Sequence, residues 1–211
     1  MGRVICLIGI DGAGKSSQAE HLVRALREKG IRCKGTHLRV SVFRLVSLPV
    51  LLLCRLLKVP EEANHPRCRG SRLLTAIWPY LFFLDFVLFY LIFNFPYYIF
   101  PGTVFVFDRY YYDGLVELMV STGDRSILEG RVGRLFQAVF PRPEVAIYMD
   151  VDEGAALRRT PENHTIEYLR KRRVFYKELA DRLGMTTIDA NRSFEEVQRD
   201  IYKLVEAKGL A

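Results

Sequence analysis

Cysteine is scarce in this chain of 211 residues: there are four, and no two of them have the Cys-x-x-Cys spacing of zinc or redox motifs. We therefore expect free thiols in a reducing compartment and no disulfide framework. Internal repeats, low-complexity tracts and linker-like stretches are also lacking, so we expect one domain over residues 1–211. No secretory signal precedes the first apolar run, which favours a cytoplasmic protein.

Acidic residues are outnumbered by basic ones, 24 against 31, which gives a formal net charge of +7 and a pI near 9.3. A basic balance suits an anionic partner such as a nucleotide, a nucleic acid or a membrane face. The densest basic run, residues 170–173, has no interleaved aromatic residues, so we expect it on the solvated face of a helix. Nucleic acid is therefore disfavoured as a partner.

A glycine-rich motif near the N-terminus is the strongest functional signal. Residues 9–16 have the sequence Gly-Ile-Asp-Gly-Ala-Gly-Lys-Ser, which fits the phosphate-loop pattern G-x-x-x-x-G-K-[ST]. In such a loop the glycines let several backbone amides point at one phosphate chain, and the following helix directs its positive end there. Lys15 is expected to reach the phosphates of ATP, and Ser16 to hold Mg²⁺. The predicted ATP-binding residues of this stretch are Gly9, Asp11, Gly12, Ala13, Gly14, Lys15, Ser16 and Ser17.

Apolar runs of strand length alternate with helical patterns along the chain. We expect strands at 4–8, 31–38, 103–108, 145–150 and 186–189, and helices at 114–121, 126–139 and 166–183. A final helix is predicted to begin with a capping box formed by Ser193 and Glu196. Alternation of this kind predicts a three-layer α/β fold, a parallel five-stranded sheet with helices on both faces. Ligands bind such sheets at the carboxyl ends of the strands.

The segment from Leu73 to Phe100 is strongly apolar and carries a single charge, Asp85. Its length would suffice to span a bilayer, but Asp85 would be costly in lipid, and Pro79 and Pro96 are expected to interrupt a helix. We favour a helix that is buried or forms a dimer, with docking onto a membrane or an apolar substrate as the alternative. Asp85 should then lie near a cation or the water of the active site. The whole stretch at about 40–101 is taken as an apolar helical insertion on the acceptor side.

Two further positions carry chemistry. Asp108, Arg109 and Tyr110 follow the predicted third strand, where a carboxylate can hold Mg²⁺ and an arginine can clamp a phosphate. Arg158 and Arg159 precede a polar stretch without apolar periodicity. Mobile arginines can close over a phosphoryl group in transfer, so we expect a lid at about 155–167.

These pieces resemble the thymidylate kinase family of nucleoside monophosphate kinases, which uses a P-loop kinase fold. The resemblance rests on GIDGAGKSSQ at 9–18, DRY at 108–110, the arginine-containing lid and IDANRSFEEV at 188–197. It implies that ATP and Mg²⁺ are cofactors, and that helices of the 73–100 region pair two subunits in a homodimer. The implied roles are catalysis for Lys15, Asp108, Arg158 and Arg159, metal binding for Ser16 and Asp108, contact with the adenine edge for Asn191, and acceptor binding for Asp11, Arg109, Tyr110 and Arg39.

The chain departs from the family pattern on the acceptor side. The family usually has Glu-Pro-Gly after the second strand, where this chain has Thr36-His37-Leu38-Arg39. After DRY the family often has a serine and an Ala-Tyr-Gln run, where this chain has Tyr111-Tyr112-Asp113-Gly114. Thymidine monophosphate (dTMP) is the leading acceptor that the resemblance implies. A kinase of the same fold acting on a sugar or a lipid carrier stays an alternative, as does a nucleotide-binding regulator with little turnover.

Overall fold

The computed structural model describes residues 2–37, 45–56, 61–62, 65–66, 72–93, 101–160 and 165–211. The chain divides into two compact units. The first comprises Met1–Leu38, Tyr97–Asp113 and Arg142–Ala211, and the second comprises Arg39–Pro96 and Gly114–Pro141. The single domain expected over residues 1–211 stays a prediction.

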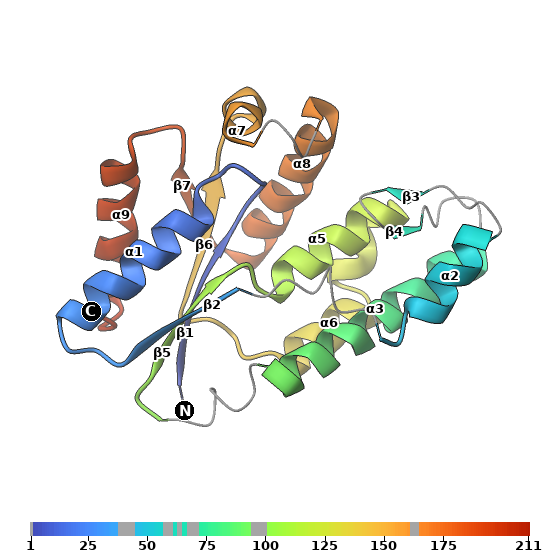
Figure 1. Cartoon of the computed structure of the whole chain (residues 1–211), viewed down its shortest axis with the longest axis horizontal. Coiled ribbons are helices and arrows are strands. Elements are labelled where there is room, and N and C mark those ends of the chain that lie inside the picture. Colours follow the sequence, from blue (N-terminus) through green and yellow to red (C-terminus); the bar gives the residue numbers. More distant parts are fainter. Residues whose placement is uncertain are drawn as a thin grey trace. The chain divides into compact units, whose positions relative to one another are not determined.

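The first unit is built on a five-stranded parallel sheet (Figure 1). The strand order is β2-β5-β1-β6-β7, and every adjacent pair is parallel. All five strands lie where the apolar runs predicted them, and the central strand is buried along nearly its whole length. The strands are β1 (Arg3–Ile8), β2 (Cys33–His37), β5 (Val104–Asp108), β6 (Val145–Asp150) and β7 (Thr186–Asp189).

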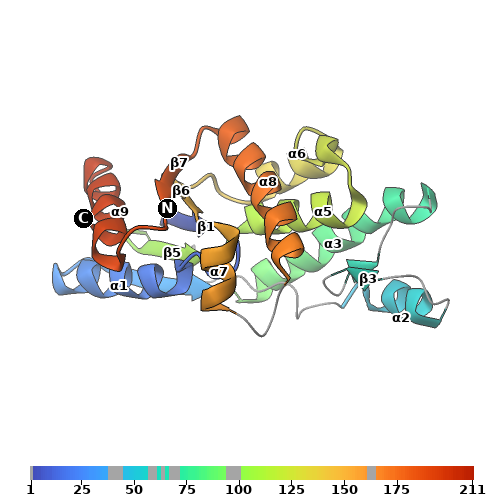
Figure 2. The ribbon, with the colours of Figure 1, turned by 90° about the horizontal axis from the view of Figure 1, so that it is seen from above.

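Helices flank this sheet, which confirms the predicted α/β fold. α1 (Lys15–Glu28) packs on β2 and β5 and beside α9 (Phe194–Ala207), as Figures 1 and 2 show. α8 (Ile166–Leu183) packs against β6 and against α7 (Glu153–Arg159). The predicted capping box of the last helix is present, because the Ser193 hydroxyl accepts from the Glu196 amide and the Glu196 carboxylate accepts from the Ser193 amide.

The second unit is mainly helical. α5 (Tyr111–Thr122) begins in the first unit and enters the second at Gly114. The helix expected at 126–139 is divided into the short 3₁₀ segment η2 (Arg125–Leu128) and α6 (Arg131–Val139). The chain folds back tightly between them, since a Cβ on Gly133 would lie 2.1 Å from the Leu128 carbonyl oxygen. The unit also contains α2 (Leu48–Leu56), α3 (Arg72–Phe93) and a small hairpin of β3 (Glu61–Glu62) and β4 (His65–Pro66).

Aromatic rings fill the core of the second unit. Five rings from α3 and the end of α6 meet with centroid separations of 4.7 to 5.7 Å, mostly edge to face. Gly114 lets α5 approach them, because a Cβ there would lie 2.6 Å from the ring of Phe86. The rings belong to Phe83, Phe86, Tyr90, Phe136 and Phe140.

α3 confirms the helix expected in the apolar segment but corrects the role of Pro79. The helix runs from Arg72 to Phe93 through Pro79, although an internal proline costs about 3 kcal/mol. Burial of the neighbouring Trp78 and Phe82 offsets that cost. Pro96 lies outside the described residues. In the part of the chain that the structure describes, no helix has the length and apolarity needed to cross a bilayer.

The two faces of α3 differ. Trp78, Phe82 and Phe86 are buried, whereas Leu73, Ile77, Tyr80, Leu84, Leu91 and Ile92 are exposed. Pairing of two copies through this helix stays a prediction. Asp85 is buried, and its carboxylate accepts from the backbone amides of Val46 (2.6 Å) and Ser47 (3.1 Å); the cation or active-site water expected near it stays a prediction. Backbone amides that precede a helix, as these precede α2, stabilise a negative charge.

Candidate functional site

The loop between β1 and α1 has a backbone that its glycines make possible. Gly9, Gly12 and Gly14 have positive φ angles of 147°, 84° and 84°. A Cβ on Gly9 would lie 2.6 Å from the Met149 carbonyl oxygen, and one on Gly12 would lie 2.5 Å from that of Ala156. Gly14 is the N-cap of α1, supplies no side-chain acceptor, and would have open space around a Cβ. The first-turn amides of α1 therefore face a cradle of the kind that holds a phosphate.

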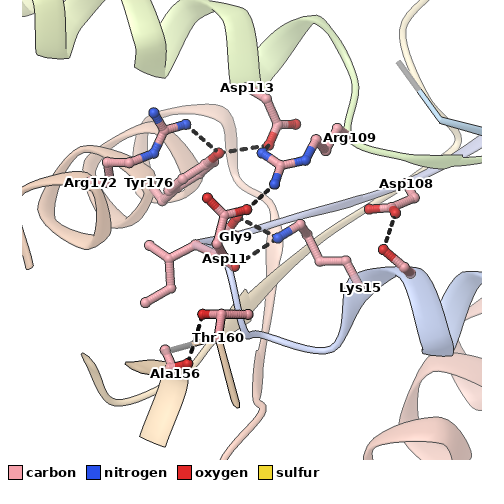
Figure 3. Close-up of polar contacts among 12 residues, drawn as sticks. Gly9, Asp11, Lys15, Asp108, Arg109, Asp113, Ala156, Thr160, Arg172 and Tyr176 are labelled. Carbon is pink, nitrogen blue, oxygen red and sulfur yellow. Dashed lines mark hydrogen bonds and ion pairs between the residues drawn. The ribbon is translucent and has the colours of Figure 1, made fainter. Parts of the chain in front are cut away.

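Lys15 is buried at the start of α1. Its Nζ donates to the carbonyl oxygens of Gly9 (2.8 Å) and Ile10 (2.7 Å), as Figure 3 shows. Burial and the nearby charge of Arg109 lower the pKa of Lys15 to about 8, against the opposing effect of nearby carboxylates, chiefly that of Asp11. The ammonium is thus positioned over the loop by two neutral acceptors, which the oxygen atoms of a polyphosphate can replace.

Ser16 and Asp108 bring two oxygen ligands together. The Ser16 hydroxyl donates to a carboxylate oxygen of Asp108, which ends β5 and is buried. Parallel pairing of β1 with β5 places Asp108 opposite Leu7, two residues before the loop. A hydroxyl and a carboxylate fit Mg²⁺, which prefers oxygen ligands and takes few of them from protein when it also binds phosphates. Among the described residues, no group of three or more His, Cys, Asp or Glu side chains is placed to hold a metal ion.

Arg109 follows in an unusual backbone conformation. Its φ angle is 71°, and among the described residues a positive φ is otherwise seen only at glycine. This conformation costs roughly 1–2 kcal/mol for a residue with a side chain. The guanidinium pairs directly with the Asp11 carboxylate from the phosphate loop (Figure 3). Burial opposes the charge on Arg109, but the carboxylates of Asp11 and Asp113 raise its pKa overall. Arg109 therefore stays cationic within reach of the loop.

Tyr110 is fully buried and packs between other rings. Its centroid lies 4.9 Å from those of Phe107 and Tyr111. Its backbone amide donates to Asp113 at 2.9 Å. Arg39, expected on the acceptor side, lies outside the described residues.

The predicted lid arginines lie at the end of α7. Arg159 Nη1 donates to the Gly12 carbonyl oxygen at 3.1 Å and to that of Ala190 at 3.3 Å, so this side chain joins the phosphate loop to the loop after β7. Arg158 is exposed in the same last turn. Residues 161–164 of the expected lid lie outside the described part of the chain.

Two remaining predicted nucleotide contacts lie at the edges of this site. Ser17 is exposed in the first turn of α1. Asn191 bridges two segments, accepting from the Asp152 amide at 2.9 Å and donating to Asp189 at 2.7 Å.

The structure adds three residues that sequence reasoning missed: Asp113, Arg172 and Tyr176. The Tyr176 hydroxyl donates to Asp113 at 2.6 Å and accepts from Arg172 Nη2 at 3.3 Å (Figure 3). The solvated face expected for residues 170–173 is wrong at Arg172, which is buried; Arg173 is partly exposed and pairs with Asp150 at 2.6 Å. Helical spacing could have placed Arg172 and Tyr176 on the buried face of α8. The buried residues of this face are spaced by three or four positions: Leu169, Arg172, Tyr176 and Leu179.

The parallel sheet, the glycine cradle at the start of α1, Lys15 and the Ser16–Asp108 pair together define a protein of the P-loop kinase class. A family model described as Thymidylate kinase matches residues 99–201. The chain is 27% identical to the "Probable thymidylate kinase" of Staphylothermus marinus, over 97% of this chain and 94% of that protein. It is 25% identical to the "Probable thymidylate kinase" of Archaeoglobus fulgidus, over 97% of this chain and 95% of that protein. By these comparisons the chain is similar to thymidylate kinases over nearly its whole length.

Proposed function

We propose that this protein is an ATP- and Mg²⁺-dependent nucleoside monophosphate kinase and that dTMP is its acceptor. The observation that carries the proposal is the meeting of three groups at the carboxyl ends of β1 and β5. These are Lys15 over the glycine cradle, the Ser16–Asp108 oxygen pair, and the Arg109 guanidinium held by Asp11. The matching family model and the names of two nearly full-length relatives support the same activity.

The residues of the donor side would act by positioning and by neutralising charge. Lys15 would turn from the Gly9 and Ile10 carbonyl oxygens to the phosphates of ATP, which are stronger acceptors. The α1 amides would hold the same phosphates. Ser16 and Asp108 would hold Mg²⁺, which when bound neutralises the charge that builds up on the transferred group.

Arg109 would bind the phosphate of the acceptor. Its contact with Asp11 fixes one edge of the guanidinium, so that less side-chain entropy is lost when the phosphate arrives. Asp11 would also take the acceptor sugar, and Tyr110 would support the position of Arg109 from within the aromatic packing. Arg158 and Arg159 would close from α7 over the phosphoryl group in transfer.

An acceptor screen coupled to ADP release tests the proposal. The panel would contain dTMP, dUMP, UMP, CMP, AMP and GMP, together with a sugar and a long-chain lipid alcohol, each with and without Mg²⁺. Lys15→Ala protein, purified identically, controls for contaminating kinases. We expect Mg²⁺-dependent ADP release that requires a nucleoside monophosphate and is fastest with dTMP. ADP release that requires the sugar or the lipid alcohol, or whose rate does not depend on any acceptor, would contradict the proposal.

A further inference from the structure

A buried hydrogen-bond chain connects α8 to the start of α5. The Tyr176 hydroxyl donates to Asp113 Oδ1 at 2.6 Å, although the two residues are 63 positions apart in the sequence. Asp113 Oδ2 accepts from the Tyr110 amide at 2.9 Å. Both side chains are buried, and Figure 3 shows them beside Arg109. Each oxygen of the Asp113 carboxylate is therefore held by a donor other than Arg109.

The two carboxylates near Arg109 are held differently as a result. Asp11 contacts the guanidinium directly, whereas Asp113 Oδ1 lies 3.9 Å from Arg109 Nη1, beyond hydrogen-bond distance. At that separation Asp113 still stabilises the positive charge, but it does not occupy the edge of the guanidinium as a bound phosphate would.

Arg172 orients the hydroxyl that restrains Asp113. Its Nη2 donates to the Tyr176 oxygen at 3.3 Å, which directs the hydroxyl proton towards Asp113. Its Nη1 donates to the Tyr168 hydroxyl at 3.0 Å, in the first turn of α8. Burial and the charge of Asp113 raise the pKa of Tyr176 well above its usual range, so Tyr176 remains a donor at neutral pH.

We propose that Tyr176 and Asp113 are positioning residues: Tyr176 holds the Asp113 carboxylate back from Arg109, so that Arg109 stays cationic, fixed and open to the phosphate of the acceptor. This rests on the proposed function, in which Arg109 binds that phosphate. Without the Tyr176 hydroxyl, the carboxylate would swing onto Arg109 and compete with the acceptor. Asp113 also accepts from Tyr110 at the start of α5, and a purely structural role of that kind would affect stability alone.

The first test compares Tyr176→Phe with Tyr148→Phe. Tyr148 is an internal match, because it is equally buried, its hydroxyl donates to the Asp150 carboxylate at 2.9 Å, and its ring stacks on Tyr176. We expect Tyr176→Phe to raise the KM for dTMP about five- to tenfold, the scale of one typical hydrogen bond, with the KM for ATP unchanged. Tyr148→Phe should leave both values near wild type. Equal effects of the two substitutions on the KM for dTMP would overturn the proposal.

A double-mutant cycle tests the mechanism directly. The Asp113→Asn side chain can still accept a hydrogen bond from the Tyr110 backbone amide, but it carries no charge that could compete for Arg109. In the Asp113→Asn background, Tyr176→Phe should therefore change the KM for dTMP by less than about twofold. An undiminished effect of Tyr176→Phe in that background would show that Tyr176 acts independently of Asp113, and would overturn the proposal.

Inorganic phosphate provides a readout that does not depend on turnover. The guanidinium NMR resonance of Arg109, assigned with Arg109→Lys, would be followed during titration with phosphate. Tyr176→Phe should weaken the response by a factor similar to its effect on the KM for dTMP, and Tyr148→Phe should not. An unchanged response in Tyr176→Phe, or no response in the wild type, would overturn the inference. Failure of the proposed function would appear separately, as wild-type protein that transfers phosphate to no nucleoside monophosphate.

Discussion

The two compact units bury charge in different ways. In the first unit, Lys15, Asp108, Asp113 and Arg172 are all buried, and the partners of the last three include the hydroxyl groups of Ser16 and Tyr176. In the described part of the second unit, the buried charge is Asp85, whose partners are two backbone amides beside an aromatic core. Hydroxyl partners can turn towards a ligand, whereas the two backbone amides that hold Asp85 are fixed by the fold. The first arrangement suits chemistry and the second suits stability.

The largest effect should come from the aromatic core. Phe136 is fully buried and contacts three other rings, so Phe136→Ala should lower the free energy of unfolding by about 3–5 kcal/mol. Leu135→Ala is the control, because Leu135 precedes Phe136 in α6 and its side chain is 38% exposed. Urea denaturation would measure both. A loss below about 1 kcal/mol for Phe136→Ala would break the assignment of this cluster as a core.

Lys15→Ala should lower activity without lowering stability. Removing a charge placed over the transferred phosphate should lower kcat about 100- to 1000-fold. The free energy of unfolding should not fall, because the structure keeps Lys15 buried at a lowered pKa. Steady-state kinetics and urea denaturation of the same preparation would measure the two quantities. Wild-type turnover would contradict the site, and a loss of stability like that of Phe136→Ala would remove the contrast between the units.

Asp85→Asn should affect stability by a smaller amount. The substitution keeps the shape but replaces one acceptor oxygen with an amide that faces a backbone N–H, which should cost about 1–3 kcal/mol. Asp124→Asn is the matched control in the same unit, since Asp124 is exposed and also accepts from a backbone amide, that of Ser126. Thermal unfolding would compare them. If Asp85→Asn lowers kcat with no loss of stability, Asp85 belongs to the chemistry and the comparison fails.

The smallest effect concerns the pair between Asp150 and Arg173. Burial opposes the charge on Asp150, but hydrogen bonds from Arg173 lower its pKa below the usual 3.8. The pair therefore adds stability above pH 3.8 and loses it as the pH falls through the lowered pKa. Arg173→Gln should cost less than about 1 kcal/mol at pH 7, because the pair is partly exposed. Thermal melts between pH 7 and pH 3 should show this difference shrinking in acid; a difference independent of pH would contradict the assignment.

Local patterns predicted the sheet and the phosphate loop well. Each strand is a short apolar run, and the phosphate loop is a contiguous motif whose glycines, Gly9 and Gly12, have positive φ angles. The predicted interruption at Pro79 failed because burial of the surrounding aromatic residues outweighs the local preference of proline. Tyr176 and Asp113 could not be paired from the sequence, because their contact depends on how α8 packs and no local spacing encodes it.

The central claim is that the site of the first unit transfers a phosphoryl group to a nucleoside monophosphate. A single turnover with γ-labelled ATP, Mg²⁺ and dTMP, with enzyme in excess over ATP, tests it most directly. We predict that the label appears in dTDP at the rate at which ADP forms, and that Lys15→Ala slows both about 100-fold or more. Label that appears only as inorganic phosphate, with every nucleoside monophosphate tried, would contradict the account.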